Sequence, residues 1–160
     1  MNTQEQIDNI FKVTGKVNIK LYDEHGNLKD ERDTHNLVVT AGRVYIAGRM
    51  QGTSVPTVMG NMAIGTSTAT PAVGQTQLTT EAGRVALASF TNGGTASVTA
   101  TATFPAGTGT GAITEAGIFN YSTYAASPTS GQFMLCRTTF PAVNKAAGDS
   151  IAITWVITVS

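Results

Sequence analysis

The stretch SIAITWVITVS, residues 150–160, decides the fold because large apolar and smaller side chains alternate along it. A period of two places alternate residues on opposite faces of a β-strand. A strand this apolar would invite aggregation as a bare edge. We therefore expect it to be paired inside a sheet or covered by another subunit. One face should form core, and it carries Ile151, Ile153, Trp155, Ile157 and Val159.

The same alternation recurs upstream, in segments separated by turn residues. We expect a first hairpin over 16–39, with its return strand running from 28 to 39, and a second over 84–104. They would turn at Gly26-Asn27 and Asn92-Gly93. The pattern predicts an all-β protein, an antiparallel, jelly-roll-like β-sandwich of about eight strands in one domain over 15–160. The remaining predicted elements are strands at 62–64, 112–120 and 131–140, and a short helix at 41–50.

Residues 1–14 are expected to form an N-terminal arm. Thr3 and Gln6 fit a capping box. Ile7, Ile10 and Phe11 follow at helical spacing and make a small apolar stripe. A helix this short is marginal alone in water and needs a surface to dock on. That surface is either its own domain or a neighbouring subunit, which makes these three residues candidate assembly contacts.

The composition favours association and argues against several function classes. The chain has 10 basic and 10 acidic residues, and only 12% of residues are charged, against roughly 25% in typical domains. No basic patch suggests nucleic-acid binding, and no apolar run approaches the ~20 residues of a membrane span. The polar N-terminus lacks the apolar region of a signal peptide. A low, balanced charge favours a protein that works inside an assembly.

Few residues suggest chemistry. Glu115 and Arg137 fall in neighbouring predicted strands and could form a structural ion pair. Tyr121 and Tyr124 lie in a predicted loop and are candidate assembly contacts. Cys136, the only cysteine, occupies a strand position and is expected in the core.

Other patterns fail as sites. His25 and His35 lack companions at metal-ligand spacing. The glycines of residues 65–67 and 105–111 match neither a phosphate loop nor a dinucleotide fingerprint. We expect no catalytic residues, no metal and no cofactor, and hence no enzyme.

A set of short motifs occurs in order along the chain. The motifs are the Asp23–Asn27 turn, His35–Val39, Met62–Thr66, Thr80-Glu81 with Arg84, Phe104–Gly107, Ile113–Asn120, Met134–Arg137, Lys145, Asp149 and Ile153–Trp155. Taken in this order, the set resembles a family of small virion proteins of tailed bacteriophages. The resemblance covers residues 15–160 and implies a structural virion component without catalytic residues.

Within that class, the first expectation is a capsid decoration (cement) protein. It would be a homotrimer that binds the major capsid protein on the outer shell and stabilises contacts between capsomers, in a virion assembled in the host cytoplasm. Alternatives are a tail, neck or head-fibre component, or a glycan-binding attachment module. Copy number separates cement from neck and fibre parts. A lone Trp155 on the core face disfavours glycan binding.

Overall fold

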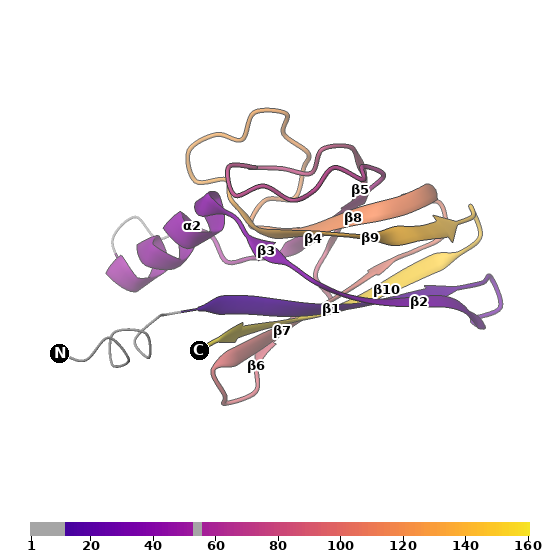
Figure 1. Cartoon of the computed structure of the whole chain (residues 1–160), viewed down its shortest axis with the longest axis horizontal. Helices are drawn as coiled ribbons and strands as arrows, with labels where there is room; N and C mark the ends of the chain where they lie inside the picture. Colours follow the sequence, from indigo (N-terminus) through magenta and orange to yellow (C-terminus); the bar gives the residue numbers. More distant parts are fainter. Residues whose placement is uncertain (1–11, 53–55) are drawn as a thin grey trace.

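The computed structural model describes residues 12–52 and 56–160 and shows two stacked antiparallel sheets of five strands each (Figure 1). This confirms the predicted all-β sandwich, with ten strands in place of about eight. The strands are β1 (Val13–Tyr22), β2 (Leu28–His35), β3 (Leu37–Val38), β4 (Asn61–Gly65), β5 (Glu81–Ala86), β6 (Ser89–Asn92), β7 (Ser97–Phe104), β8 (Gly111–Phe119), β9 (Met134–Lys145) and β10 (Ser150–Val159).

The first sheet, here called the open sheet, has the order β2-β1-β10-β7-β6. The decisive strand β10 lies at its centre and pairs along its length with β1 and β7. Its predicted core face is buried from Ile151 to Ile157, and Trp155 is 0% exposed. Val159, at the end of the strand, is exposed. Pairing on both sides satisfies the expectation that so apolar a strand is no bare edge.

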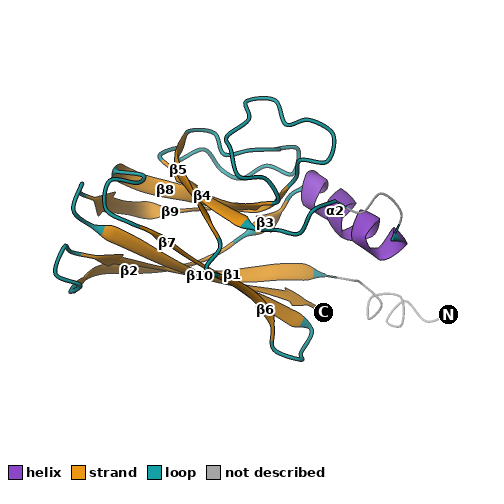
Figure 2. Ribbon diagram, turned by 180° about the vertical axis from the view of Figure 1, so that it is seen from behind, coloured by secondary structure: helices purple, strands orange, loops and turns teal. Residues whose placement is uncertain are grey.

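The second sheet, here called the covered sheet, has the order β3-β9-β8-β4-β5. Two loops, 66–80 and 120–133, lie over its outer face (Figures 1 and 2). Leu78 from the first loop and Tyr121 from the second pack against Ala63, Phe119 and Met134 of the sheet. A second, smaller core therefore sits outside this sheet, in addition to the main core between the sheets.

Between the described strands the chain passes from one sheet to the other four times, at β2–β3, β5–β6, β7–β8 and β9–β10. The predicted continuous strand 28–39 is wrong, because the chain changes sheet at Asn36. Leu37 and Val38 then pair with β9, which brings Val38 into the main core. The predicted hairpin 84–104 is likewise split, since β5 belongs to the covered sheet. Only its β6–β7 part forms a hairpin.

The helix α2 (Thr40–Gln51) closes one end of the sandwich and matches the predicted helix to within one residue at each end. Gly42 lies so close to the Leu135 carbonyl that a Cβ there would collide with it. Gly52 ends the helix with a left-handed φ of 74°, a conformation that glycine adopts without strain. The C-terminus lies near this end (Figure 1). Among the described residues, no helix is long and apolar enough to cross a membrane.

Candidate assembly site

The predicted partners Glu115 and Arg137 lie on the neighbouring strands β8 and β9, and the structure brings them together on the outer face of the covered sheet. Glu115 Oε2 is 2.9 Å from Arg137 Nε and 2.7 Å from Nη2. Both side chains are 0% exposed. Burying two charges is costly unless further polar contacts accompany the pair, so the surroundings of both groups decide whether it can persist.

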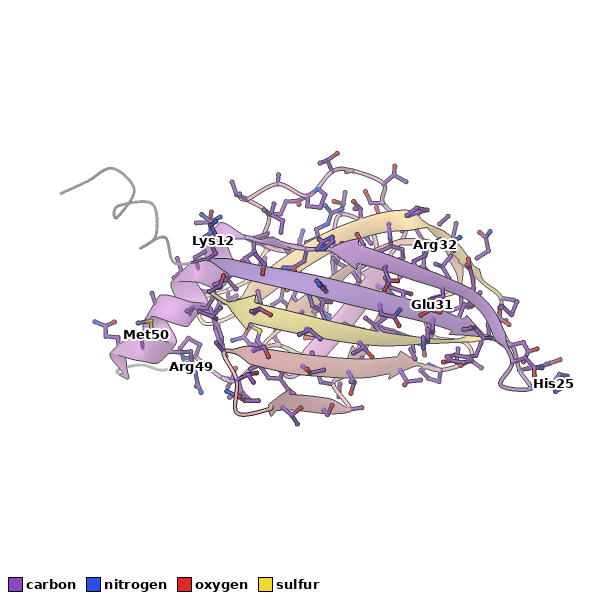
Figure 3. The ribbon with its side chains drawn as sticks, turned by 60° about the horizontal axis from the view of Figure 1, so that its bottom comes forward. Lys12, His25, Glu31, Arg32, Arg49 and Met50 are labelled. Carbon is purple, nitrogen blue, oxygen red and sulfur yellow. The ribbon has the colours of Figure 1, made fainter. Side chains whose placement is uncertain are left out.

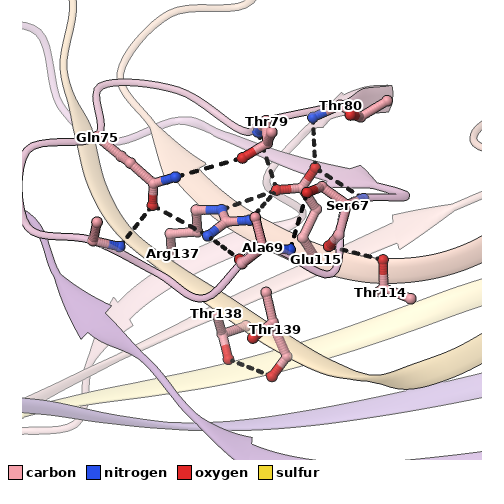
Figure 4. Close-up of polar contacts among 11 residues, drawn as sticks. Ser67, Ala69, Gln75, Thr79, Thr80, Thr114, Glu115, Arg137, Thr138 and Thr139 are labelled. Carbon is pink, nitrogen blue, oxygen red and sulfur yellow. Dashed lines mark hydrogen bonds and ion pairs between the residues drawn. The ribbon is translucent and has the colours of Figure 1, made fainter.

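Backbone amides of the loop 66–80 supply those contacts to the carboxylate (Figure 4). Thr80 N–H donates to Glu115 Oε1 at 2.8 Å and Ser67 N–H at 3.4 Å. Thr79 N–H donates to Oε2 at 3.1 Å. These three backbone donors replace hydrogen bonds to water that the carboxylate loses on burial. Glu115 is therefore the point on which both ends of the loop converge.

The guanidinium of Arg137 holds the middle of the same loop. Its Nη1 donates to the carbonyl of Ala69 at 2.9 Å and to Gln75 Oε1 at 3.1 Å. Because both charged groups are enclosed and engaged with the protein, the pair cannot contact a substrate. It fixes a surface loop to the sheet.

A second buried ion pair joins Glu81 and Arg84 of β5, with Arg84 Nη2 2.7 Å from Glu81 Oε2. The guanidinium lies 3.9 Å from the ring centre of Phe119 and 4.6 Å from that of Tyr121. Its Nη1 also donates to the Tyr121 carbonyl at 2.9 Å. No sequence signal indicated this pair, because residues three apart lie on opposite faces of a regular strand. The structure has a register shift opposite Glu81 and Gly83, between Gly65 and Ile64, that interrupts this alternation.

Tyr121 is not the exposed contact residue that its loop position predicted. It is 8% exposed, because its ring packs edge-on against Phe119 beneath the loop 120–133. Burial raises the pKa of its phenol, an effect that nearby Arg84 opposes. Asn120 holds this loop down by accepting from Phe133 N–H at 2.6 Å and donating to the Gly131 carbonyl at 2.8 Å.

Tyr124, in contrast, is 53% exposed and remains available for contact. It borders a shallow hollow of about 500 Å³ formed with residues 79–83. This hollow lies beside the loop that Glu115 and Arg137 anchor. The two tyrosines predicted as contact residues therefore differ: Tyr121 belongs to the core and Tyr124 to the surface.

The outer face of the open sheet divides into a charged half and a hydroxyl half. The charged half, on β1 and β2, includes Lys20 and Glu31, whose Nζ and Oε1 atoms are 3.7 Å apart (Figure 3). In the other half, the register of β10, β7 and β6 places uncharged Ser and Thr side chains side by side on this face. Charges on the edge strand β2 discourage sheet-to-sheet pairing. The hydroxyl residues are Ser89, Thr91, Ser97, Thr99, Thr101, Thr103, Thr154 and Thr158.

An apolar groove of about 590 Å³ runs between α2 and the beginning of β1. Figure 3 shows Lys12 and Met50 at this end of the molecule. Met50 is 81% exposed, and Val44, also on the helix, is 55% exposed. Sequence reasoning missed the groove, because it arises only where the helix packs beside β1 and β3. Its lining residues are Lys12, Val13, Thr14, Asn36, Leu37, Val38, Arg43, Ile46, Ala47 and Met50.

The predicted arm meets the body at this groove. Ile7, Ile10 and Phe11 lie outside the described residues. The predicted boundary after residue 14 is wrong, because Val13 and Thr14 belong to β1 and pair with Val159 and Thr158. Lys12 and Ser160 also bond through their backbones in both directions, at 2.6 and 2.9 Å. Lys12, Val13 and Thr14 therefore belong to the folded body.

Within the described part of the chain, no three or more His, Cys, Asp or Glu side chains gather to hold a metal ion. Cys136 is buried, and burial raises the pKa of its thiol, so it is an inert core residue. The chain matches no family model, no curated protein and no solved structure.

Proposed function

We propose that this chain is a structural protein of a tailed-bacteriophage virion, specifically a capsid decoration protein. It would bind the major capsid protein on the outer shell as a homotrimer and stabilise contacts between capsomers. The observation that carries the proposal is how the charged core groups are used. Glu115 and Arg137, both 0% exposed, hold a surface loop rigid instead of facing a cleft.

Decoration requires a rigid body with broad contact surfaces, and three features support that role. The two ion pairs fix the loops of the covered sheet. The open sheet presents an uncharged hydroxyl surface. The groove beside α2 lies where the N-terminal segment leaves the body. Segments that join neighbouring copies would let their separate contacts with the shell act together, so a modest affinity per copy suffices.

The ordered motifs that resemble small virion proteins support the same class. A tail, neck or head-fibre component is the alternative, because it too would be β-rich and oligomeric. A glycan-binding module is less well supported. Such a site needs exposed aromatic rings around a shallow surface, and Trp155 is fully buried. The exposed aromatic residues among those described, Phe90 and Tyr124, lie on β6 and on the covering loop.

Binding to capsids tests the proposal. The full chain should bind to particles stripped of it, and a chain lacking residues 2–11 should stay folded but be retained more weakly. The matched control is Thr154→Ala, on the open sheet away from the groove. Quantitative mass spectrometry of purified virions should find hundreds of copies per particle. A dozen copies or fewer would favour the neck or fibre alternative, and absence from virions would overturn the proposal.

A further inference from the structure

We propose that the groove between α2 and β1 binds the N-terminal segment of a second copy of this chain. The stripe of Ile7, Ile10 and Phe11 from one subunit would fill the groove of its neighbour. This rests on the proposed assembly role and names the contact through which copies join.

The groove has the chemistry to receive an apolar stripe. Its walls include Val38, Ile46, Ala47 and Met50. Its volume of about 590 Å³ falls within the roughly 300–1,000 Å³ of pockets that enclose whole ligands. An amphipathic segment that lays apolar residues at i, i+3 and i+4 into a groove is a recurrent mode of recognition. The stripe supplies three large side chains at that spacing.

The groove and the segment proposed to fill it carry opposite charges. Lys12 and Arg43 line the groove and are exposed. Residues 1–11 carry Glu5 and Asp8 and no lysine or arginine. Opposite charges of this kind steer association and fix orientation.

Connectivity favours a second copy over the chain's own groove. Lys12 is held extended by its two backbone bonds to Ser160. To enter its own groove with the stripe intact, the chain would have to reverse at Phe11 and Lys12, which are poor turn residues. The turn formers Asp8 and Asn9 lie inside the stripe. A turn there would separate Ile7 from Ile10, whereas a neighbouring groove accepts the stripe whole.

Disulfide trapping between two full-length variants tests the exchange. Cys136 is buried, so the engineered thiols are the reactive ones. Ile10→Cys protein mixed with Ala47→Cys protein should give a covalent dimer containing one of each. The yield should be at least tenfold above that of Ile10→Cys mixed with Thr154→Cys, whose thiol is exposed on the open sheet. No excess over this control would overturn the proposal.

The Ile10→Cys/Ala47→Cys double variant distinguishes a segment bound in a neighbour's groove from one bound in its own groove. Buried Cys136 should again not react. Exchange predicts covalent dimers and larger species on non-reducing gels. A monomer closed by an internal bridge would overturn the exchange and assign the groove to the chain's own segment.

A labelled peptide of residues 1–11 tests the groove directly. It should bind the chain that lacks residues 2–11, and more weakly as salt concentration rises. Replacing Ile10 by Asp in the peptide should weaken binding at least tenfold, and equal binding would overturn the proposal. None of these measurements uses capsids. If disulfide trapping succeeds but the chain does not bind to particles, the decoration role would be overturned and the exchange between copies would still hold.

Discussion

The outer faces of the two sheets differ, although the sheets share one core. The open sheet shows its outer face to solvent, so β10 alternates between buried and accessible residues along its length. The covered sheet carries two loops over its outer face, and β8 is buried from Ile113 to Phe119 without alternation. One sheet is thus held by apolar packing on a single face. The other is held on two faces, the second through a smaller apolar core and buried ion pairs.

The difference shows what buried charges accomplish in this fold. An ion pair in a core is weak evidence for stability, because well-packed apolar residues often do as well. Here the carboxylate and guanidinium bind backbone groups of a loop without regular secondary structure, which apolar side chains could not do. The covered sheet gains an ordered outer layer, whereas the open sheet keeps a flat surface.

The largest effect is expected from Trp155→Ala, which empties the centre of the core that both sheets share. Because Trp155 is 0% exposed, we expect the free energy of unfolding to fall by about 3–5 kcal/mol. Urea denaturation measures the change. Thr154→Ala, one residue away on the open face, should change it by less than about 0.5 kcal/mol. Equal effects would contradict the assignment of the two faces.

Glu115→Gln should cost about 3 kcal/mol, near the lower end of the range for breaking a buried pair, since the amide oxygen can still accept bonds. It should act locally as well. Amide hydrogen exchange should accelerate at Thr79 and Thr80, whose N–H groups bind the carboxylate at 3.1 and 2.8 Å. Exchange in β10 should rise only by the global loss of stability. Unchanged protection in residues 66–80 would show that the charge does not hold the loop.

A smaller effect is expected from Gly65→Ala, at the end of β4. A Cβ there would collide with the Thr80 carbonyl and with the Glu115 side chain. Overpacking of this kind costs about 1–3 kcal/mol. Gly74→Ala, in the loop 66–80 and with nothing within 4 Å of its Cβ, is the matched control. Thermal unfolding should separate the two variants, and equal midpoints would argue against tight packing of the loop.

The smallest effect is expected on the pH dependence of stability, through the ion pair between Lys29 and Asp149. Hydrogen bonds from Lys29 Nζ, at 2.7 Å, and from Ala146 N–H lower the pKa of the Asp149 carboxyl. A lowered folded pKa contributes stability above the ordinary aspartate value of about 3.9, and that stability is lost as pH falls through the folded pKa. Lys29→Met should therefore flatten the dependence of stability on pH below about 4. Lys20→Met, which removes an exposed pair, should leave that slope unchanged.

Sequence patterning identified the open sheet well, because one of its faces is exposed to solvent and apolar and polar residues therefore alternate along β10, β1 and β7. It could not identify the covered sheet as fully, since strands buried on both faces lose that alternation. Glu115 and Arg137 could be paired from their strand positions, but no sequence pattern near them predicted that the loop 66–80 covers the pair. Tyr121 was misplaced for the same reason. The groove depends on how α2 packs beside β1, which no single segment of sequence encodes.

We propose that this sandwich decorates a capsid through the end where α2, the groove and the N-terminal segment meet. A cryo-electron-microscopy reconstruction of the virion that carries the chain tests it most directly, because one map gives position, symmetry and copy number. We expect trimers on the outer shell at three-fold or quasi-three-fold positions, in hundreds of copies, with residues 1–11 of one copy in the groove of its neighbour. Density confined to the neck, tail or fibres, in a dozen copies or fewer, would contradict it.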